Sequence, residues 1–344
     1  MKNINWGIIG LGNIANKFAE SFSEVSNCSL KGIASKNNDN LNLFKDKFNI
    51  EDKFCFNNYK DLISNTNIDI IYIALPNSFH AKYITECIEN KKKVLVEKPA
   101  VTNFKEFKNI KKIIIQNETY FTEGFMYRYL PYLLKLKEII LSRSLGDVVE
   151  IKSNFNSKIY KQKKIFGFKI RKPDYSSRLF KKDLGGGAIL DLGCYPLSFS
   201  TFVNSLTHNV QLKDISLENI QKEYCESGVD IFSSAQINFN GKFKSNIMCS
   251  FKDKFDQSTE INFEKGSILI NETWVPNKKM TMHIVNQGNG NTMAFENKEN
   301  ICSYQIDNIS SQLLNQKVKP VFPSLTIDEI ETNSDLLDRW INFE

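Results

Sequence analysis

The sequence contains little of the material from which metal sites and disulfide frameworks are built. Among its 344 residues there are three histidines, His80, His208 and His283, and no two of them are close in sequence. The seven cysteines are also spread out, and none belongs to a CxxC pair. An odd number of scattered cysteines argues against a disulfide framework and is typical of the reducing cytosol. We therefore expect no metal site and a cytoplasmic location.

Long apolar runs and blocks of like charge are missing as well. The longest apolar runs, such as residues 70–75, are too short to cross a bilayer, and we expect no secretory segment before the first strand. The net charge is +6, but the lysines are scattered, with no block longer than residues 91–93. We attribute the excess to a general bias towards Lys, Asn and Ile, and expect neither a nucleic-acid nor a membrane partner.

The first third of the chain alternates short apolar runs with amphipathic stretches. We predict strands at residues 4–9, 29–34, 69–75, 93–96 and 119–122, and helices at 14–22, 41–48, 80–88 and 104–115. Alternation at this spacing is typical of a parallel sheet with crossover helices. We therefore expect an α/β protein whose residues 1–123 form a Rossmann domain, a doubly wound parallel sheet that binds a dinucleotide.

After about residue 145 the pattern becomes that of a largely antiparallel, open sheet. Strands are predicted at 148–155, 229–239, 260–263 and 267–270. Asn240-Gly241 predicts a type I′ hairpin, because both central residues of that turn take positive φ. We expect residues 124–344 to form an α+β domain for substrate binding and oligomerisation, with a last helix at about 325–342 that packs back towards the first domain.

A glycine-rich turn follows the first predicted strand and opens the first helix. Its sequence, Gly10-Leu11-Gly12-Asn13-Ile14-Ala15, is the G-x-G-x-x-A form of the dinucleotide fingerprint. Gly10 permits the tight turn, Gly12 lets the backbone approach a pyrophosphate, and Ala15 allows close helix–strand packing. The backbone of Asn13 and Ile14 begins the helix whose N-terminus faces the phosphates.

The end of the second strand is where such a fold senses the adenosine ribose. NAD-binding proteins usually place Asp or Glu there, whereas this chain has Ser35 and Lys36. A hydroxyl and a cation suit a 2′-phosphate, so we expect NADP in preference to NAD. The alternative is that Lys36 is an ordinary surface lysine. We expect Asp39 to cap the helix that begins near Leu41.

Two further segments carry groups suited to acid–base chemistry. Glu97-Lys98-Pro99 ends a predicted strand, and ligands of doubly wound sheets lie beyond the carboxyl ends of the strands. A glycine triplet at residues 185–187 opens a predicted helix on which Asp191 and Tyr195 share one face. A phenol can give and take a proton beside a hydride path, and a lysine cation such as Lys98 eases its release. The alternative is that Tyr195 packs in a core and Asp191 caps a backbone group.

Together these segments resemble the Gfo/Idh/MocA oxidoreductases over nearly the whole chain. The resemblance rests on residues 6–15, 73–80, 97–99, 123–131 and 183–196. It implies that Lys98 is the catalytic lysine, that Tyr195 is the proton donor or acceptor, and that Asp191 orients the reacting hydroxyl. It also implies further cofactor-binding positions, at Leu75, Pro76, Asn77, His80, Glu97 and Lys98. It implies substrate-binding positions at Arg128, Asp191 and Tyr195.

The sequence departs from many relatives at two positions. Leu130 stands where many of them have His, and Tyr195 stands where inositol-type relatives have His. Tyrosine at the second position resembles the dihydrodiol dehydrogenase, aldose dehydrogenase and keto-sugar reductase branches. The resemblance therefore implies hydride transfer between a nicotinamide and a sugar, keto-sugar or polyol.

The family offers two alternatives to a dehydrogenase. One branch cleaves glycosides with tightly held NAD, but those relatives usually carry His in place of Tyr195. Non-catalytic, cofactor-binding regulators tend to lose Lys98. Relatives also commonly form homodimers or homotetramers through the C-terminal sheet, whose far face we expect to be apolar.

The loop from Asn156 to Arg178 is rich in cations and is a candidate to reach over the site. Arg171 and Arg178 would favour a phosphorylated, acidic or nucleotide-linked substrate, and on this reading Arg178 contributes to substrate binding. The alternative is that these cations belong to an ordinary solvated surface.

Overall fold

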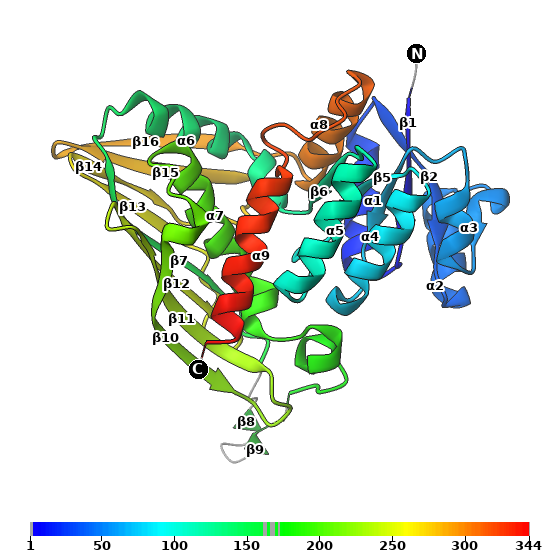
Figure 1. Ribbon diagram of the computed structural model, residues 1–344, viewed down its shortest axis with the longest axis horizontal. Coiled ribbons are helices and arrows are strands. Elements are labelled where there is room, and N and C mark those ends of the chain that lie inside the picture. Colours follow the sequence, from blue (N-terminus) through cyan, green and yellow to red (C-terminus); the bar gives the residue numbers. More distant parts are fainter. Residues whose placement is uncertain (1–2, 161–163, 166–168, 171–172, 344) are drawn as a thin grey trace. The chain divides into compact units, whose positions relative to one another are not determined.

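The structure is a computed structural model and describes residues 3–160, 164–165, 169–170 and 173–343 (Figure 1). Its residues divide by their contacts into two compact units. The first unit consists of Met1–Leu130 and Lys298–Ser334, and the second of Pro131–Asn297 and Asp335–Glu344. The sequence-based division at residue 123 differs from this one chiefly in the segment Lys298–Ser334, which joins the first unit.

The first unit is built on a six-stranded, all-parallel sheet with the order β3-β2-β1-β4-β5-β6. Its strands are β1 (Ile4–Ile9), β2 (Cys28–Ala34), β3 (Cys55–Phe56), β4 (Ile70–Ile73), β5 (Lys93–Val96) and β6 (Phe121–Glu123). Its crossover helices are α1 (Asn13–Glu20), α2 (Asn38–Phe48), α3 (Tyr59–Ser64), α4 (His80–Glu89) and α5 (Phe104–Gln116). The predicted Rossmann sheet is confirmed, although the short β3 and α3 were not predicted. The strand order reverses at β1 and β4, where ligands of such sheets bind.

Apolar periodicity placed the elements well, but one helix cap was assigned to the wrong residue. The side chain of Asn37, not Asp39, caps α2 by accepting a hydrogen bond of 3.0 Å from the backbone N–H of Asn40. The helix begins at Asn38, so Asp39 already lies inside the first turn. Its carboxylate there still suits the positive end of the helix dipole.

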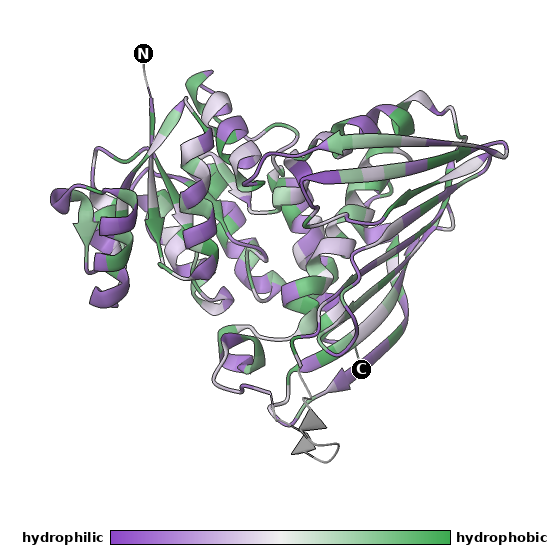
Figure 2. Cartoon of the chain, turned by 180° about the vertical axis from the view of Figure 1, so that it is seen from behind, coloured by the Kyte–Doolittle hydropathy of each residue, from purple (hydrophilic) through white to green (hydrophobic). Residues whose placement is uncertain are grey.

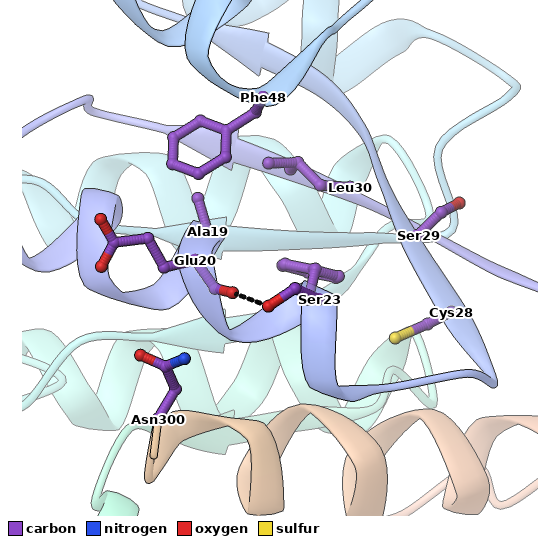
Figure 3. Close-up of a pocket in the computed structure, with 9 residues that line it drawn as sticks. Ala19, Glu20, Ser23, Cys28, Ser29, Leu30, Phe48 and Asn300 are labelled. Carbon is purple, nitrogen blue, oxygen red and sulfur yellow. Dashed lines mark hydrogen bonds between the residues drawn. The ribbon is translucent and has the colours of Figure 1, made fainter.

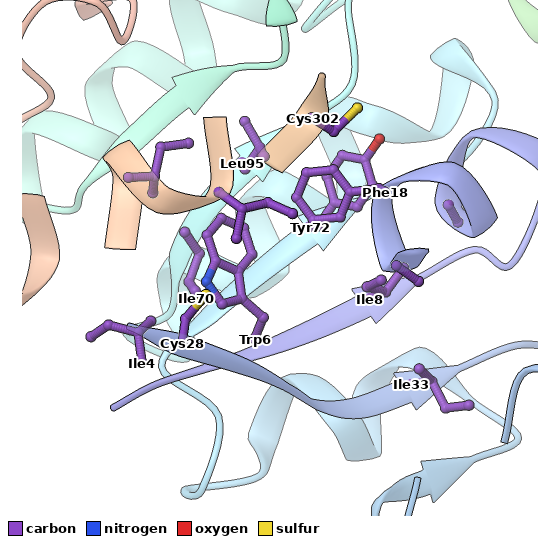
Figure 4. Close-up of a cluster of buried hydrophobic side chains, with 14 of the residues drawn as sticks. Ile4, Trp6, Ile8, Phe18, Cys28, Ile33, Ile70, Tyr72, Leu95 and Cys302 are labelled. Carbon is purple, nitrogen blue, oxygen red and sulfur yellow. The ribbon is translucent and has the colours of Figure 1, made fainter. Parts of the chain in front are cut away.

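Helix α8 (Cys302–Leu314) completes the core of the first unit, and the sequence analysis did not predict it. Trp6, on β1, is fully buried, and its indole N–H donates to the Oγ of Ser310 at 2.9 Å. Ile306 and Ile309 of α8 belong to the same apolar cluster as Trp6, part of which Figure 4 shows. These contacts are the physical reason why Lys298–Ser334 belongs with the first unit.

The last helix, predicted at about 325–342, is α9 (Ile327–Ile341). Its first half belongs to the first unit, where Lys111 of α5 forms ion pairs with Asp328 at 2.9 Å and Glu331 at 2.7 Å. Its second half belongs to the second unit, where the indole N–H of Trp340 donates to the Oγ of Ser233 at 2.9 Å.

The second unit is built on an eight-stranded sheet with the order β10-β11-β12-β7-β13-β14-β15-β16. Its strands are β7 (Val148–Asn156), β10 (Ile215–Tyr224), β11 (Asp230–Phe239), β12 (Lys244–Ser250), β13 (Thr259–Phe263), β14 (Gly266–Ile270), β15 (Lys279–Asn286) and β16 (Asn289–Glu296). The pairing is antiparallel except between β7 and β12, so the expected largely antiparallel sheet is confirmed. Helices α6 (Pro131–Ser142) and α7 (Cys194–Leu206) belong to the same unit.

Shorter elements complete the two units. The strands β8 (Lys164–Ile165) and β9 (Lys169–Ile170) form a small sheet of their own. Short 3₁₀ helices lie at Ser21–Glu24, Asp52–Phe54, Asn77–Phe79, Met126–Tyr129, Arg178–Phe180, Lys182–Leu184 and Leu212–Asp214. The predicted hairpin is confirmed: φ is 52° at Asn240 and 69° at Gly241, and Lys242 N donates to Phe239 O at 3.0 Å.

The large sheet has one buried and one open face, because buried residues alternate with more exposed ones along β11 and β12. Figure 2 shows the strands coloured by hydropathy. The open face carries a ladder of polar side chains. Gln236 donates to Asn246 at 2.9 Å, and Asn246 donates to Glu150 at 2.8 Å. The expectation of an apolar far face is therefore wrong for these central strands, where amides and carboxylates satisfy one another.

The described part of the chain lacks membrane-spanning helices and clustered metal ligands. No described helix combines the length and apolar character needed to cross a membrane. Among the same residues, no group of three or more His, Cys, Asp and Glu side chains is arranged to hold a metal ion.

Candidate active site

The glycine-rich turn between β1 and α1 has the geometry that a dinucleotide requires. Gly10 has φ of 87°, and a Cβ there would lie 2.6 Å from the carbonyl oxygen of Ala74, so only glycine fits. At Gly12, in contrast, a Cβ would meet nothing within 4 Å. Gly12 is the N-cap of α1 and supplies no side-chain cap to the N–H groups that follow it. Open space in front of an uncapped helix N-terminus fits a bound pyrophosphate.

Ser35 and Lys36 lie where the second strand ends, as the sequence predicted. Ser35 is buried, and its hydroxyl oxygen accepts a hydrogen bond of 3.1 Å from the backbone N–H of Asn37. Lys36 is exposed, with its ammonium 5.6 Å from the ring centroid of Tyr59. This edge of the sheet therefore presents a cation and a hydroxyl, and no carboxylate from either residue.

The loop after β4 and the loop after β5 are joined through His80, the first residue of α4. The imidazole is completely buried. Its Nδ1 lies 2.8 Å from the carbonyl oxygen of Pro99, and its Nε2 lies 2.9 Å from that of Leu75. His80 thus connects Leu75, just before Pro76 and Asn77, to the segment that carries Lys98.

Glu97 and Lys98 follow β5 directly and are both half-buried. The hydroxyl of Tyr72, on β4, donates a short hydrogen bond to the carboxylate of Glu97. The peptide bond between Lys98 and Pro99 is cis. Because they follow the last residue of β5, Glu97 and Lys98 stand at the carboxyl edge of the sheet that the glycine-rich turn also borders.

Glu123 is a neighbour that the sequence analysis gave no role. It ends β6, next to β5, and is 2% exposed. Its Oε1 accepts a hydrogen bond of 2.7 Å from the backbone N–H of Ala100. Burial raises the pKa of this carboxyl to about 8; the Glu97 carboxylate adds to the rise, while the Ala100 N–H and Lys98 oppose it. The signal in the sequence was an acid directly after a predicted strand. That this strand lies beside the one that precedes Glu97-Lys98-Pro99 is known only from the sheet order.

In the second unit, Tyr195 lies in the first turn of α7 and is packed between aromatic rings. It is 5% exposed. Its ring centroid lies 5.1 Å from that of Phe155, edge to face, and 5.8 Å from that of Trp274. The indole N–H of Trp274 is itself fixed by the carbonyl oxygen of Asn154 at 2.9 Å. This packing holds the phenol in one orientation.

Asp191 does not lie on an ordinary α-helix, which corrects the sequence prediction. Residues Ile189–Gly193 form a π-helical turn that leads into α7. Such turns often occur at functional sites. The turn is tightly enclosed, because a Cβ at Gly193 would lie 2.9 Å from the ring of Trp340. Asp191 forms an ion pair of 3.4 Å with Arg178, so two predicted substrate-binding residues are brought together.

Asp230, on β11, anchors the start of this turn and was missed by the sequence analysis. Its Oδ2 accepts a hydrogen bond of 2.7 Å from the backbone N–H of Ile189. Burial raises the pKa of the carboxyl to about 6, against the effect of the backbone N–H groups that it accepts from. A Cβ at Gly187 would overlap this carboxylate, which explains one glycine of the triplet.

Arg128 lies in a different setting from the one expected of a substrate-binding residue. It is 1% exposed and forms an ion pair of 2.8 Å with Glu329 of α9. Its Nε donates to the carbonyl oxygen of Pro323 at 3.3 Å. We interpret Arg128 as a structural residue of the first unit, because the buried guanidinium has almost no surface left for a ligand.

The loop from Asn156 to Arg178 is described only in part. Residues 161–163, 166–168 and 171–172 lie outside the described part of the chain, and the prediction for Arg171 falls among them. Arg178 is described and is 43% exposed at its side chain.

A separate hollow of about 660 Å³ lies elsewhere in the first unit (Figure 3). Cys28, Ser29 and Leu30 line it, and these residues begin β2. It therefore lies at the amino end of that strand, whereas ligands of doubly wound sheets bind at the carboxyl ends. We do not assign this hollow to the cofactor.

Two family models match the chain. The model described as an oxidoreductase family with an NAD-binding Rossmann fold matches residues 4–125. The model of the GFO/IDH/MocA C-terminal domain matches residues 133–269. The chain belongs to the Gfo/Idh/MocA oxidoreductase family. The resemblance inferred from the sequence motifs is thereby confirmed, as are an NAD(P)-binding fold and oxidoreductase membership.

Named relatives are similar to this protein over most of its chain. A trans-1,2-dihydrobenzene-1,2-diol dehydrogenase of Xenopus tropicalis is 25% identical over 79% of this chain and 76% of its own length. Oxidoreductase P35 of Formosa agariphila is 29% identical over 77% of this chain and 78% of its own. A D-xylose 1-dehydrogenase (NADP(+)) of Hypocrea jecorina is 25% identical over 72% and 62%, respectively.

Solved structures of two oxidoreductases share the fold. A 3-ketoreductase from Actinomadura kijaniata, in complex with NADP and TDP-benzene, aligns with a TM-score of 0.83 at 18% identity, over 98% of this chain and 97% of that one. An aldose-aldose oxidoreductase from Caulobacter crescentus, complexed with glycerol, aligns with a TM-score of 0.84 at 17% identity, over 99% and 97%.

Proposed function

We propose that this oxidoreductase transfers a hydride between a nicotinamide cofactor and a sugar, keto-sugar or polyol. The observation that carries the proposal is the joint presence of Lys98 at the carboxyl edge of a dinucleotide-binding sheet and Tyr195 in a fixed aromatic setting. Similar proteins are named for a dihydrobenzene diol, for D-xylose and for a dTDP-linked didehydro-dideoxyglucose, which supports this substrate class.

The first unit would hold the cofactor along the carboxyl ends of β1, β2, β4 and β5. The backbone of Gly10, Gly12, Asn13 and Ile14 would bind the pyrophosphate, and Leu75, Pro76 and Asn77 line the next strand end. When bound, the cofactor supplies or accepts the hydride. We propose NADP over NAD, since Lys36 is exposed and Ser35 replaces the carboxylate that would repel a 2′-phosphate.

The remaining roles concern the proton and the substrate. Tyr195 would exchange a proton with the reacting oxygen, a step that accompanies hydride transfer to or from a carbonyl. Lys98 would stabilise the charge that develops on that oxygen and ease the release of the phenolic proton. Asp191 would orient the hydroxyl, with Arg178 holding the carboxylate in place at 3.4 Å.

The first test is reduced-nicotinamide absorbance with a panel of aldoses, keto-sugars and diols, followed by single-turnover measurements on variants. Tyr195→Phe should lower the rate of hydride transfer about 10²–10⁴-fold, because it removes the proton donor and keeps the ring. Lys98→Met should lower it at least as much, and both variants should still bind cofactor. A Tyr195→Phe rate near that of the wild type would contradict the assignment.

The same assay separates the family's other activities. Glycoside cleavage without net change in nicotinamide absorbance would identify the hydrolase branch. Cofactor binding with no turnover of any substrate in the panel would indicate a regulator. Either outcome would replace the proposal of net hydride transfer.

We also propose that the protein forms a homodimer or homotetramer through the open face of its large sheet. The support for this interface comes from polar side chains rather than apolar ones. The ladder of Gln236, Asn246 and Glu150 could pair with the same ladder on a second copy of the protein. Light scattering that shows only monomer at micromolar concentration would end this proposal.

A further inference from the structure

His80 makes two hydrogen bonds that a neutral imidazole cannot make together. Its Nδ1 lies 2.8 Å from the carbonyl oxygen of Pro99 and its Nε2 lies 2.9 Å from the carbonyl oxygen of Leu75. Carbonyl oxygens only accept hydrogen bonds, so each contact needs an N–H on the ring. A neutral imidazole carries one such N–H, and an imidazolium carries two.

The neutral ring would leave a costly mismatch in a buried place. One nitrogen lone pair would face a carbonyl lone pair, and no solvent can satisfy either group, because His80 is completely buried. Turning the ring over would replace both nitrogens by carbons and lose both bonds. Only the doubly protonated ring satisfies both carbonyl groups in this geometry.

We propose that His80 is held as an imidazolium that clamps the loop after β4 to the loop after β5 and so positions Lys98. Pro99 follows Lys98 directly, so a bond to its carbonyl oxygen fixes the backbone from which the lysine projects. His80 is thus a positioning residue. The clamp itself needs only the structure, whereas its effect on turnover rests on the proposed function.

The charges around His80 act in both directions. The N-terminus of α4 and Lys98 disfavour a cation, while the carboxylate of Glu97 at the neighbouring strand end favours it. Glu123, whose pKa burial raises to about 8, is uncharged at neutral pH and favours neither form by charge. Hydrogen bonds from a charged donor are about twice as strong as neutral ones. The two bonds to the carbonyl oxygens of Leu75 and Pro99 therefore stabilise the imidazolium further. On α4 itself the other titratable groups are Lys82, Tyr83, Glu86, Cys87 and Glu89. The elements packed against α4 add Tyr59, Lys60 and Asp61 of α3, Tyr72 of β4, Lys93 of β5, and Lys105, Glu106, Lys108, Lys111 and Lys112 of α5.

The direct test is the protonation state of the imidazole nitrogens in the cofactor-free protein. The chain has three histidines, so ¹⁵N-detected imidazole spectra from about pH 6 to about pH 9 contain three spin systems around the ordinary titration range. His208→Gln and His283→Gln assign two of them, and His80 follows by elimination even if its own variant does not fold. We expect both His80 nitrogens to stay protonated at neutral pH.

A single protonated nitrogen on His80 at neutral pH would overturn the proposal. This measurement uses no substrate, so its failure is distinct from a failure of the proposed hydride transfer. Conversely, if His80 is an imidazolium but the protein turns over no substrate, the proposal for His80 stands and the proposed function is refuted.

The second test connects the clamp to Lys98 once a substrate is known. His80→Gln offers donors from one nitrogen only, so it cannot bond both carbonyls, and turnover at neutral pH should fall about tenfold or more. The wild-type rate should decline in the pH range where the spectra show that His80 loses a proton. This decline should be absent from the pH–rate profile of His80→Gln. Unchanged turnover and pH profile in His80→Gln would exclude a positioning role, and His283→Gln serves as the matched control.

Discussion

The carboxylate of Asp230 accepts a hydrogen bond of 2.7 Å from the backbone N–H of Ile189, the residue that begins the π-helical turn. Removing this acceptor in Asp230→Ala leaves a buried N–H unsatisfied and frees the segment that carries Asp191. We expect turnover to fall about tenfold or more, with cofactor affinity unchanged, because the glycine-rich turn belongs to the other unit. Steady-state kinetics and cofactor titration measure the two quantities separately.

Asp230→Asn keeps an acceptor oxygen and provides the matched control, with an expected loss smaller than that of Asp230→Ala. The pKa of Asp230 is raised to about 6, above the ordinary value of about 3.9. The native state therefore binds the proton more tightly than the unfolded state does. Relative to Asp230→Asn, the wild type should lose stability as pH rises from about 4 to about 6. A difference that does not vary over this range would show that Asp230 titrates normally.

Gly10 and Gly12 should respond differently to the same added methyl group. Gly10→Ala places a Cβ 2.6 Å from the carbonyl oxygen of Ala74 at a φ of 87°, so the free energy of unfolding should fall by at least about 1 kcal/mol. Gly12→Ala adds its Cβ to open space and should change stability by less than about 0.5 kcal/mol. It should nevertheless weaken cofactor binding about tenfold or more, because the backbone can no longer approach the pyrophosphate. Thermal unfolding and cofactor fluorescence titration test the pair, and a normal cofactor affinity in Gly12→Ala would refute the site.

Cofactor choice should depend on the end of β2. Ser35→Asp introduces a carboxylate that accepts from a ribose 2′-hydroxyl and repels a 2′-phosphate, so the preference should change from NADP to NAD. Lys36→Met should weaken NADP binding more than NAD binding, and the difference should shrink at high salt. Competitive titrations with both cofactors measure the preference. Wild-type protein that binds NAD as tightly as NADP would contradict the interpretation of Lys36.

Glu123 should make stability depend on pH through neutrality. Its pKa is raised to about 8 by burial, above the ordinary value of about 4.3, so the native state retains a proton that the unfolded state loses. Stability should therefore fall as pH rises from about 5 to about 8, by on the order of 1.4 kcal/mol for each unit of pKa difference. Glu123→Gln, which mimics the protonated acid, should remove this slope. Denaturant unfolding at several pH values tests it, with the exposed Glu118→Gln as control; an equal slope in Glu123→Gln would be evidence against the raised pKa.

Elements with strong apolar runs were predictable, and polar ones were not. The strand at residues 4–9 and its glycine-rich turn followed from sequence because burial on both faces of a parallel sheet selects a continuous apolar run. Helix α8 was missed because its sequence, CSYQIDNISSQLL, mixes polar residues into the buried face; Ser310 and Gln312 are buried there with hydrogen-bond partners. Tertiary contacts with Trp6 and Tyr120, not local pattern, decide its structure.

The candidate site divides in the same way. Gly10, Gly12 and Lys98 could be placed from sequence, since a strand end and a turn locate them without knowledge of distant contacts. Arg128 could not, because its pairing with Glu329 joins residues 201 positions apart. Asp230 and Glu123 lie on strands whose neighbours are set by sheet order, which a single sequence does not reveal. The hydrogen bonds of the π-helical turn around Asp191 span one residue more than those of an α-helix, too small a difference for a spacing argument.

The assignment of Lys298–Ser334 to the first unit has a consequence for how the chain is made. A ribosome would deliver the six-stranded sheet complete while the helix that covers Trp6, α8, is still untranslated, with the whole segment 131–297 between them. During that interval the nascent sheet would expose the apolar side of β1, where chaperones bind and where neighbouring nascent chains aggregate. The rate at which the second half of the message is translated would thus determine how long the apolar side of β1 stays exposed to aggregation.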